Sequence, residues 1–318
     1  MASEFDLIRK YFSRPTHQTP LGVGDDAALI APDAGMALAV STDMLVVGTH
    51  FLPEANPFHV GWKSLAVNLS DMAAMGALPK WATLALALPT ADETWVEQFA
   101  AGFFMCADKY QVDLIGGDTT RGPLTISVQI MGEVRANQTL LRSGAKPGDE
   151  IWVSGKLGDA ALALAALQGR HALDQDELDA CLSALNTPQP RVELGLLLNV
   201  MVHSAIDISD GLLADLGHIL QASNVGAEIN LQHVPCSHIA RSRLADPLVQ
   251  QMVLAGGDDY ELCFTAPARN HAEIAKMATL IGVPLTRIGT ITEASGLVVR
   301  GLDNQIININ KPGFDHFA

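Results

Sequence analysis

The chain has 318 residues, which is long for one hydrophobic core, and its 48% hydrophobic residues are enough to build two. Its 35 acidic residues outnumber 20 basic ones, for a net charge of −15. An acidic surface offers no counter-charge to nucleic acid or to an anionic membrane, so we expect neither as a partner. No apolar stretch approaches the roughly 20 residues of a membrane span. Since the N-terminus also lacks a secretory-signal pattern, we expect a cytoplasmic protein.

The spacing of apolar residues and of Pro and Gly breakers predicts a mixture of helices and strands. A first helix is expected over 4–13, with Phe5, Ile8 and Phe12 on one side. The rest of the first half is expected to form strands at 27–31, 36–40, 81–88, 112–115 and 124–134 and helices at 56–74 and 92–110. The second half is expected to form strands at 151–154, 204–206 and 261–265 and helices at 158–168, 176–185, 192–202 and 211–223.

Residues 144–149 are the best candidate for a domain boundary, because two glycines and a proline separate two apolar patterns there. We therefore expect an N-terminal domain over 1–143 and a C-terminal domain over 144–318. Strands and helices follow one another without a strict βαβ rhythm, so the expected class is α+β with layered sheets and helices. The four cysteines show no metal-binding or disulfide spacing, and Cys106 and Cys263 are expected in the cores.

Acidic residues repeatedly follow apolar runs, beside glycine or on predicted turns. The pattern occurs at 24–26 (GDD), 41–43 (STD), 68–71 (NLSD), 116–118 (GGD), 207–210 (DISD) and 256–259 (GGDD). Several carboxylates that converge on one place would repel each other unless cations lay between them. Hard oxygen ligands favour Mg²⁺, and Mg²⁺ in proteins usually accompanies phosphate. The pattern therefore predicts a magnesium-dependent enzyme that acts on a nucleotide phosphate.

Each acidic motif alone also has an ordinary structural explanation. Asp and Gly are common turn residues, and Asp210 could simply cap the helix predicted after it. Asp71 is more informative because it shares a face of a predicted helix with Asn68. It would be either an internal hydrogen-bond partner or a metal ligand, and we favour the ligand. Asp207 and Asp210, three residues apart before a helix, could form a second metal platform.

Glycines and cations suited to phosphate lie near these motifs. The glycine pair before Asp118 lets a phosphate approach the backbone closely, and Arg121 and Arg142 are cations that could neutralise it. The P-loop pattern is absent from the sequence, as are protein-kinase and serine-hydrolase motifs. A polyphosphate would therefore be held by metals and by scattered Arg and Gly contacts.

Three further features could contact an organic substrate. His50 lies beside an aromatic residue after the motif at 41–43, although a lone histidine of this kind is more often a packing or surface residue. Glu261 opens a predicted strand and could be merely solvated. The C-terminal residues 313–317 (GFDHF) combine aromatic rings with a carboxylate, which suits a flat cationic ring.

Seven segments in chain order resemble the thiamine-monophosphate kinase family, within the aminoimidazole-ribonucleotide-synthetase-like (AIR-synthetase-like) superfamily. They are GVGDDAA, STDMLVVGTHF, KSLAVNLSDMAAMGA, LIGGDTTRGP, RSGAKPGD, DISDGL and GGDDYELCF. The ordered set is specific, although each motif alone is not, and the match extends to the C-terminal DHF. The resemblance implies two α+β domains, with ATP in a cleft and the N-terminal sheet paired with its twin across a homodimer. It also implies transfer of the γ-phosphoryl group of ATP to thiamine monophosphate, giving thiamine diphosphate and ADP.

The same resemblance implies roles for individual residues. Ligands of several Mg²⁺ ions would be Asp26, Ser41, Thr42, Asp43, Asp71, Asp118, Asp207 and Asp210. ATP contacts would be Gly117, Asp118, Arg142 and Ser209, and thiamine contacts would be His50, Glu261 and Phe317. The aromatic residue that contacts ATP in the family is left unassigned among Phe103, Phe104 and Tyr110. No general base is assigned, because a substrate phosphate is already ionised and in-line transfer depends on positioning and charge neutralisation.

Two other interpretations stay open from the sequence. A different superfamily enzyme would activate or phosphorylate another acceptor. Selenophosphate synthesis would be expected to need a reactive cysteine near the N-terminus, whereas the first cysteine here is Cys106 in an apolar segment. A non-catalytic nucleotide-binding regulator that depends on Mg²⁺ or Ca²⁺ is the other alternative. Carboxylate motifs in both halves of the chain, enough for several ions, disfavour it.

Overall fold

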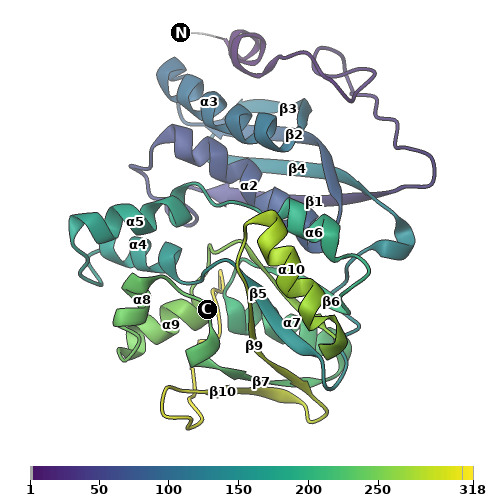
Figure 1. Ribbon diagram of the computed structural model, residues 1–318. Coiled ribbons are helices and arrows are strands. Elements are labelled where there is room, and N and C mark those ends of the chain that lie inside the picture. Colours follow the sequence, from purple (N-terminus) through teal and green to yellow (C-terminus); the bar gives the residue numbers. More distant parts are fainter. Residues whose placement is uncertain (1–2, 310, 318) are drawn as a thin grey trace. The chain divides into compact units, whose positions relative to one another are not determined.

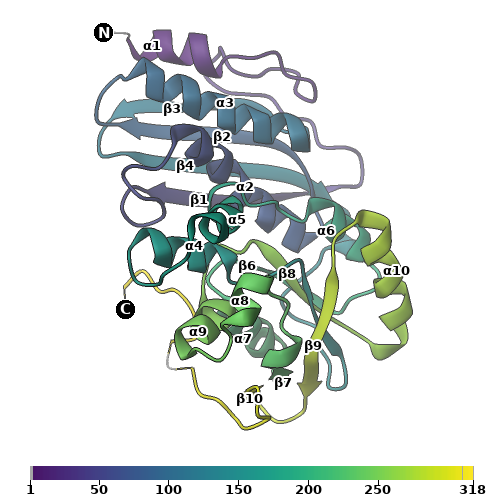
Figure 2. The ribbon, with the colours of Figure 1, turned by 60° about the vertical axis from the view of Figure 1, so that its left-hand side comes forward.

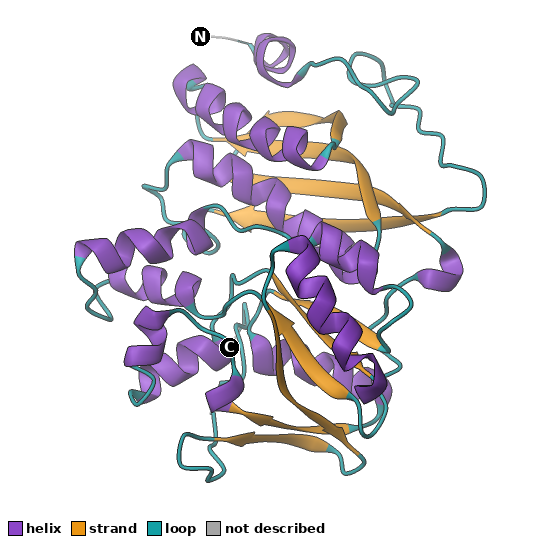
Figure 3. Ribbon diagram, viewed as in Figure 1, coloured by secondary structure: helices purple, strands orange, loops and turns teal. Residues whose placement is uncertain are grey.

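The computed structural model describes residues 3–309 and 311–317 and divides into two compact units (Figure 1). The first unit comprises the chain up to residue 72 together with 77–137, and the second comprises 73–76 and the chain from 138 onward. Each unit combines a sheet with helices (Figure 3), which confirms the expected α+β class. Among the described residues, no helix is both long enough and apolar enough to cross a membrane.

The first unit contains one four-stranded sheet in the order β1-β4-β2-β3. β2 pairs in parallel with β3 and antiparallel with β4, and β4 pairs antiparallel with β1. The elements of this half of the chain are α1 (Glu4–Leu7), η1 (Ile8–Phe12), β1 (Ala37–Val46), α2 (Pro57–Met75), β2 (Leu78–Leu88), α3 (Glu93–Tyr110), β3 (Asp113–Arg121), β4 (Thr125–Val134) and η2 (Ala136–Gln138).

Helices α2 and α3 cover one face of this sheet (Figures 1 and 2). They approach closely at Gly61, where an added Cβ would lie 2.0 Å from the carbonyl oxygen of Phe99. Phe99 and Phe103 of α3 are fully buried, as is Cys106, which the sequence predicts as a core residue. The Asp92 side chain accepts hydrogen bonds from two backbone N–H groups and so fixes the start of α3 where the sequence predicts it.

The opposite face of the sheet is open along β1, which is an edge strand. Side chains of a strand alternate between the two faces, and in β1 the exposed set is apolar apart from Thr42. Leu38, Val40 and Met44 are 40%, 52% and 56% exposed. This row of apolar side chains is a candidate surface for association with another chain.

Residues 27–31 do not form the predicted strand. The side chains of Ala28 and Ile30 instead pack against a small core of Trp81, Ile115 and Met131. In this stretch only an isolated bridge joins Leu29 to Leu21. The segment between the two expected strands, residues 32–35, is fixed by a hydrogen bond: the backbone N–H of residue 33 donates to the Glu133 carboxylate at 2.9 Å.

The predicted N-terminal helix is present as α1 and η1, but its buried face differs from the prediction. Leu7 and Phe12 are buried, whereas Phe5 is 70% exposed. The helix is held against α3 by an ion pair between Lys10 and Glu93, with nitrogen and oxygen 2.7 Å apart. η1 is a π-helix, in which each backbone hydrogen bond spans five residues and not four. This shifts the side chains that follow around the helix axis, so α-helical spacing predicts the wrong buried face.

The second unit contains a six-stranded sheet in the order β10-β7-β9-β5-β8-β6, in which only the β10–β7 pair is parallel. Its strands are β5 (Glu150–Ser154), β6 (Ser204–Ile208), β7 (Gly226–Asn230), β8 (Glu261–Ala266), β9 (Leu285–Thr292) and β10 (Gly296–Arg300). Its helices are α4 (Asp159–Leu167), α5 (Gln175–Asn186), α6 (Val192–Leu198), α7 (Leu212–Ser223), α8 (His238–Ser242), α9 (Pro247–Ala255), α10 (His271–Ile281) and the short turns η3 (Leu231–His233) and η4 (Ala268–Asn270).

Helices lie on both faces of the second sheet. On one face α7 packs against β6 and β8, over a core that includes Ile151, Ile206 and Cys263, the second cysteine predicted to be buried. On the other face, Trp152 stacks on Phe264 and contacts the ring of a histidine at the start of α10. Because both faces are covered, β6 and β8 are buried along their whole length.

Two of the acidic motifs lie within strands and not on the turns that the sequence predicts. β1 pairs with β4 from Ala37 to Val46, so the motif at 41–43 is in mid-strand. β3 continues six residues beyond Ile115, so the motif at 116–118 pairs with β2. Glycine and aspartate are rare inside strands, which explains why propensity ends both elements too early.

Candidate functional site

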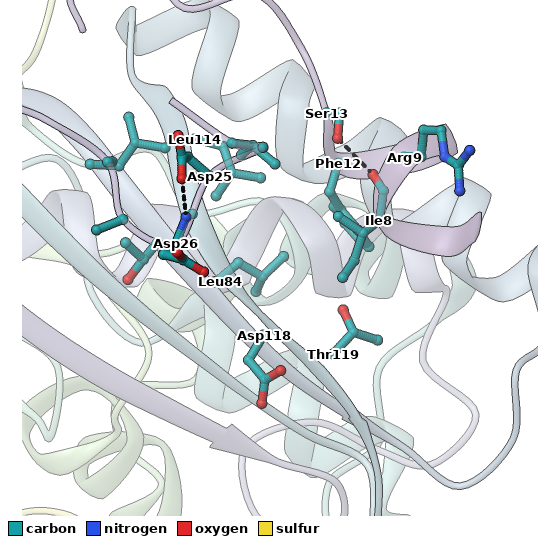
Figure 4. Close-up of a pocket in the computed structure, with 18 of the residues that line it drawn as sticks. Ile8, Arg9, Phe12, Ser13, Asp25, Asp26, Leu84, Leu114, Asp118 and Thr119 are labelled. Carbon is teal, nitrogen blue, oxygen red and sulfur yellow. Dashed lines mark hydrogen bonds between the residues drawn. The ribbon is translucent and has the colours of Figure 1, made fainter. Parts of the chain in front are cut away.

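A cavity of about 770 Å³ lies in the first unit, between the N-terminal helix and the paired strands β2 and β3. It is lined by Asp25 and Asp26 from one loop and by the 116–119 segment of β3. Figure 4 shows Ile8 and Phe12 facing the cavity from the helix, apart from these carboxylates. The cavity therefore joins an apolar wall to carboxylates, two surfaces that suit the apolar and the metal-bound ends of a nucleotide.

Gly117 is the glycine that the β3 geometry requires. Its φ is +148°, and a Cβ built on it would lie 1.8 Å from the carbonyl oxygen of Leu84. No larger residue could occupy this position without moving β3 away from β2. The next residue, Asp118, pairs across the strands with Ala85 and is exposed. It lines the same cavity as Asp26, so the structure places these two predicted ligands on one cavity.

A second group of predicted ligands lies where β1 meets α2. The Ser41 hydroxyl donates a hydrogen bond to the Asp71 carboxylate. The backbone N–H of Asp43 donates to the side-chain oxygen of Asn68 at 3.2 Å. Ser41 and Asp43 alternate with Thr42 along the strand, so Thr42 lies on the opposite face and is exposed. The shared helix face of Asn68 and Asp71, predicted from their spacing, is confirmed.

His50 lies in the tight turn that follows β1. The backbone N–H of Val46 donates to its Nδ1 at 2.9 Å, and its own N–H donates to the carbonyl of Val46 at 3.0 Å. Because Nδ1 accepts a hydrogen bond, the neutral ring carries its proton on Nε2. His50 is therefore held by the turn in the tautomer that has its N–H at Nε2.

In the second unit, the 209–211 loop is organised by a residue that the sequence analysis does not single out. Three backbone N–H groups, of Ser209, Asp210 and Gly211, donate to one oxygen of Asp215, each at 3.1 Å. Burial raises the pKa of Asp215 to about 7, and the nearby Asp210 carboxylate adds to the rise, while the three N–H groups oppose it. Asp207 precedes this loop in β6 and is 5% exposed.

Asp210 does not cap the following helix as its ordinary explanation would require. The N-cap residue of α7 is Gly211, without a side-chain hydrogen bond, and Asp215 binds the free N–H groups from inside the first turn. This leaves the Asp210 side chain out of the cap. Asp215 lies in the first turn of α7, where acidic residues are common because they stabilise a helix. Its position in the sequence therefore does not indicate that it organises the loop.

The GGDD segment packs against the same loop. The backbone N–H groups of Asp258 and Tyr260 donate to the carbonyls of Ser209 and Ile208, at 2.9 and 2.8 Å. Asp258 and Tyr260 have φ values of +72° and +50°, which are unfavourable for residues with a side chain. Such strained positions persist where surrounding contacts fix them, and they concentrate at functional sites.

The C-terminal segment reaches this loop as well. The N–H of Phe314 donates to the carbonyl oxygen of Asp210 at 3.0 Å, and a Cβ on Gly313 would lie 2.8 Å from that oxygen. Phe317, a predicted thiamine contact, is fully exposed, and its backbone N–H donates to Asp315. The segment is therefore anchored near its start and presents its last aromatic ring to solvent.

Glu261 is not merely solvated, because its side chain is 7% exposed and ion-paired with Arg191. It also accepts a hydrogen bond from the Ser154 hydroxyl at 2.6 Å. Neither partner carried a motif in the sequence. Arg142 is exposed, and its carbonyl accepts a 3.4 Å hydrogen bond from Ser223, so only its backbone is tied.

The donor atoms of the predicted ligands fit Mg²⁺ in chemistry. All are carboxylate or hydroxyl oxygens, without a thiolate or imidazole, and Ser41 and Asp71 offer two oxygens close enough for one ion. Within 3–309 and 311–317, no three His, Cys, Asp or Glu side chains form a ready metal cluster. Mg²⁺ in proteins commonly uses one or two carboxylates and completes its shell with water and substrate phosphates. A phosphate-bridged arrangement therefore suits these donors better than an all-protein cage.

Comparison with known proteins decides the family. The N-terminal domain model of AIR synthase related proteins matches residues 24–134, and the C-terminal domain model matches residues 146–301. Thiamine-monophosphate kinase of Escherichia coli K12 is 45% identical over 99% of this chain and 98% of its own length. The chain belongs to the thiamine-monophosphate kinase family. The resemblance seen in the sequence motifs is thereby confirmed.

Solved structures of this family have the same fold. The thiamine-monophosphate kinase of Stenotrophomonas maltophilia K279a is 49% identical, with a TM-score of 0.85 over 91% of this chain and 92% of that one. A structure described as AaThiL complexed with AMPPCP and TMP is 30% identical, with a TM-score of 0.79 over 98% of this chain and 96% of that one. The two-domain AIR-synthetase-like architecture expected from the sequence is confirmed.

Proposed function

We propose that this protein transfers the γ-phosphoryl group of ATP to the phosphate of thiamine monophosphate, which gives thiamine diphosphate and ADP. The observation that carries the proposal is the 45% identity to an E. coli thiamine-monophosphate kinase along nearly the whole chain. A family member that shares the fold over 98% of this chain is described as complexed with AMPPCP and TMP. The protein is thus a phosphotransferase with a phosphate group as acceptor.

ATP is the co-substrate in this proposal, and four residues are assigned to it. Gly117 and Asp118 both line the 770 Å³ cavity, and the missing side chain of Gly117 lets β3 lie against β2 there. Arg142 offers an exposed guanidinium, which binds phosphate through planar paired hydrogen bonds. Ser209 contributes a hydroxyl on the 209–211 loop, which Asp215 fixes.

Several Mg²⁺ ions are proposed to bind between the acidic side chains and the phosphates. Their ligands would be Asp26, Ser41, Thr42, Asp43, Asp71, Asp118, Asp207 and Asp210. When bound, Mg²⁺ supplies neutralisation of phosphate charge and a fixed geometry for in-line transfer. The support for this assignment is the oxygen-only donor set and the pairing of Ser41 with Asp71.

Transfer requires one oxygen of the thiamine phosphate to approach the γ-phosphorus opposite the bridging oxygen of ADP. A bond forms between the acceptor oxygen and the γ-phosphorus, and the bond to the bridging oxygen breaks as ADP leaves. The acceptor oxygen is already ionised near neutral pH, so the chain need not remove a proton. Its residues hold two anions in line, which is the main source of catalysis in such reactions.

His50, Glu261 and Phe317 are assigned to the thiamine part of the substrate. The tautomer of His50 that Val46 selects has its N–H donor at Nε2, the group proposed to contact the substrate. Glu261 provides a buried carboxylate, and Phe317 an exposed aromatic ring that suits a flat cation. These roles belong to binding, so substitutions there are expected to raise KM more than they lower kcat.

Three broader assignments accompany this function. The domains are proposed to be an ATP- and metal-binding domain over 1–143 and a domain over 144–318 that completes the substrate site. The protein is proposed to work in the cytoplasm, without nucleic acid or membrane as a partner. A homodimer is proposed to form through the N-terminal sheet, whose edge strand β1 exposes Leu38, Val40 and Met44.

The first experiment is turnover of ATP with thiamine monophosphate and Mg²⁺, with both products identified by chromatography. We expect ADP and thiamine diphosphate in equal amounts, and neither when EDTA is added or the acceptor is omitted. ADP formed only with another acceptor would indicate a sister synthetase of the superfamily. ATP binding without any turnover would indicate the regulator.

Asp71→Asn tests the metal-ligand role at the junction of β1 and α2. Asparagine keeps the size and one acceptor oxygen but removes the charge, so we expect kcat to fall about a hundredfold or more while the fold is kept. Thermal unfolding should change little. Asp92→Asn is the matched control, because asparagine caps α3 as well as aspartate does. Activity like that of the wild type in Asp71→Asn would remove Asp71 from the metal site.

Val40→Glu tests the proposed dimer. A charge in the exposed apolar row of β1 would be buried in a sheet-to-sheet interface, so we expect the variant to sediment as a monomer. Val200→Glu is the control, since Val200 is 78% exposed in the second unit. An unchanged sedimentation coefficient in Val40→Glu would rule out this surface, and a monomeric wild type would rule out the dimer.

A further inference from the structure

Glu261 is held by side chains from two other segments of the second unit. Arg191 donates to it through two nitrogens: Nε lies 2.6 Å from Oε2, and Nη2 contacts Oε1. The Ser154 hydroxyl donates to Oε2 at 2.6 Å. Ser154 in turn accepts a 2.8 Å hydrogen bond from the backbone N–H of Leu262. The carboxylate is therefore fixed to its own strand as well as to β5 and to the start of α6.

These contacts use most of the hydrogen-bonding capacity of the Glu261 carboxylate. Each carboxylate oxygen can accept about two hydrogen bonds. Oε2 accepts from both Ser154 and Arg191, whereas Oε1 accepts, among the residues that the structure describes, from Arg191 alone. By this count, one acceptor direction on Oε1 remains for a ligand. A single directional acceptor is suited to one N–H group.

The backbone next to this carboxylate is shaped to admit it. Gly155 has a φ of +58°, and a Cβ on it would lie 1.8 Å from Oε1 of Glu261. Its N–H is bound to the carbonyl of Pro284 at 2.8 Å, so the glycine cannot simply move aside. The position of Oε1 is thus set by a residue that must lack a side chain, in addition to the ion pair.

The charge of the pair indicates which part of the substrate it meets. A guanidinium stays protonated at any physiological pH, so the pair of Arg191 and Glu261 has no net charge. A neutral pair offers little attraction to a cation but still offers the oriented lone pair of Oε1. Thiamine contains a cationic thiazolium ring without N–H groups and an aminopyrimidine ring with an amino group. The amino group is the part that matches a directional acceptor.

We propose that Arg191 is a positioning residue that fixes Glu261 to accept a hydrogen bond from the amino group of the aminopyrimidine ring. This inference rests on the proposed function, because it concerns how the same site recognises thiamine monophosphate. Arg191 itself follows two prolines at 188 and 190, whose fixed φ angles restrict the backbone that carries it. Its side chain is 21% exposed and that of Glu261 is 7% exposed, so the pair is largely shielded from water.

Arg191→Lys is the first test, because lysine keeps the charge but loses the planar fork. We expect KM for thiamine monophosphate to rise about tenfold or more, with kcat and KM for ATP changed little, since chemistry occurs at the phosphates. Arg243→Lys is the matched control: Arg243 binds both oxygens of Glu177, at 2.6 and 2.8 Å, within the same unit. An equal KM shift in both variants, or none in Arg191→Lys, would overturn the proposal.

A substrate analogue tests the contact itself. In 4′-deaminothiamine monophosphate a hydrogen replaces the amino group, so Oε1 would be left without its donor. We expect wild-type kcat/KM to fall about a hundredfold for this analogue, because a buried polar group loses its partner. The Glu261→Gln variant should discriminate much less between the two substrates. Equal use of both substrates by the wild type would overturn the amino-group assignment.

The double variant separates a positioning role from an independent one. If Arg191 acts through Glu261, Arg191→Lys should raise KM little further in a Glu261→Gln background. Multiplying effects would show that Arg191 acts by itself and would overturn the proposal. Failure of the proposed function would look different, since the wild type would then form no thiamine diphosphate from thiamine monophosphate at all.

Discussion

The repulsion between negative charges is the constraint on which this structure depends. The chain carries 15 more acidic than basic residues, and the reaction proposed for it joins two phosphates. Carboxylates at close range disfavour each other and any incoming phosphate unless cations lie between them. The fold distributes its candidate ligands accordingly, over the loop at Asp26, strands β1 and β3, helix α2 and the loop after β6.

Backbone geometry, more than side-chain clustering, gives these ligands their positions. Gly117 allows β3 to lie against β2 with Asp118 at the cavity, and Asp215 gathers three backbone N–H groups beneath the 209–211 loop. The positive φ values of Asp258 and Tyr260 are maintained by hydrogen bonds to that same loop. Each of these contacts fixes the main chain, so the carboxylates that it carries are held in defined positions, as the proposed metal and phosphate sites would require.

The sequence predicts the helices up to α7 and most strands up to β8, because periodicity and breakers indicate them directly, but it places no element at α8, α9, α10, β7, β9 or β10. Asn68 and Asp71 were placed on one helix face by spacing alone, and the structure confirms it. The predicted ends of β1 and β3 are wrong, because Gly and Asp favour turns and therefore predict that a strand stops. In the structure β1 continues to pair with β4, and β3 with β2, through these acidic motifs. Arg191 and Asp215 were missed for another reason. Their roles arise from contacts between distant segments, which local pattern does not report.

The most direct test of the charge constraint is the affinity for AMPPCP with and without Mg²⁺, measured by calorimetry at fixed ionic strength. Metal-bridged phosphates should bind well with Mg²⁺ and about a hundredfold more weakly in EDTA, because the acidic side chains then face the phosphates directly. Equal affinity in both conditions would show that arginine and backbone contacts suffice. The acidic motifs would then need another explanation.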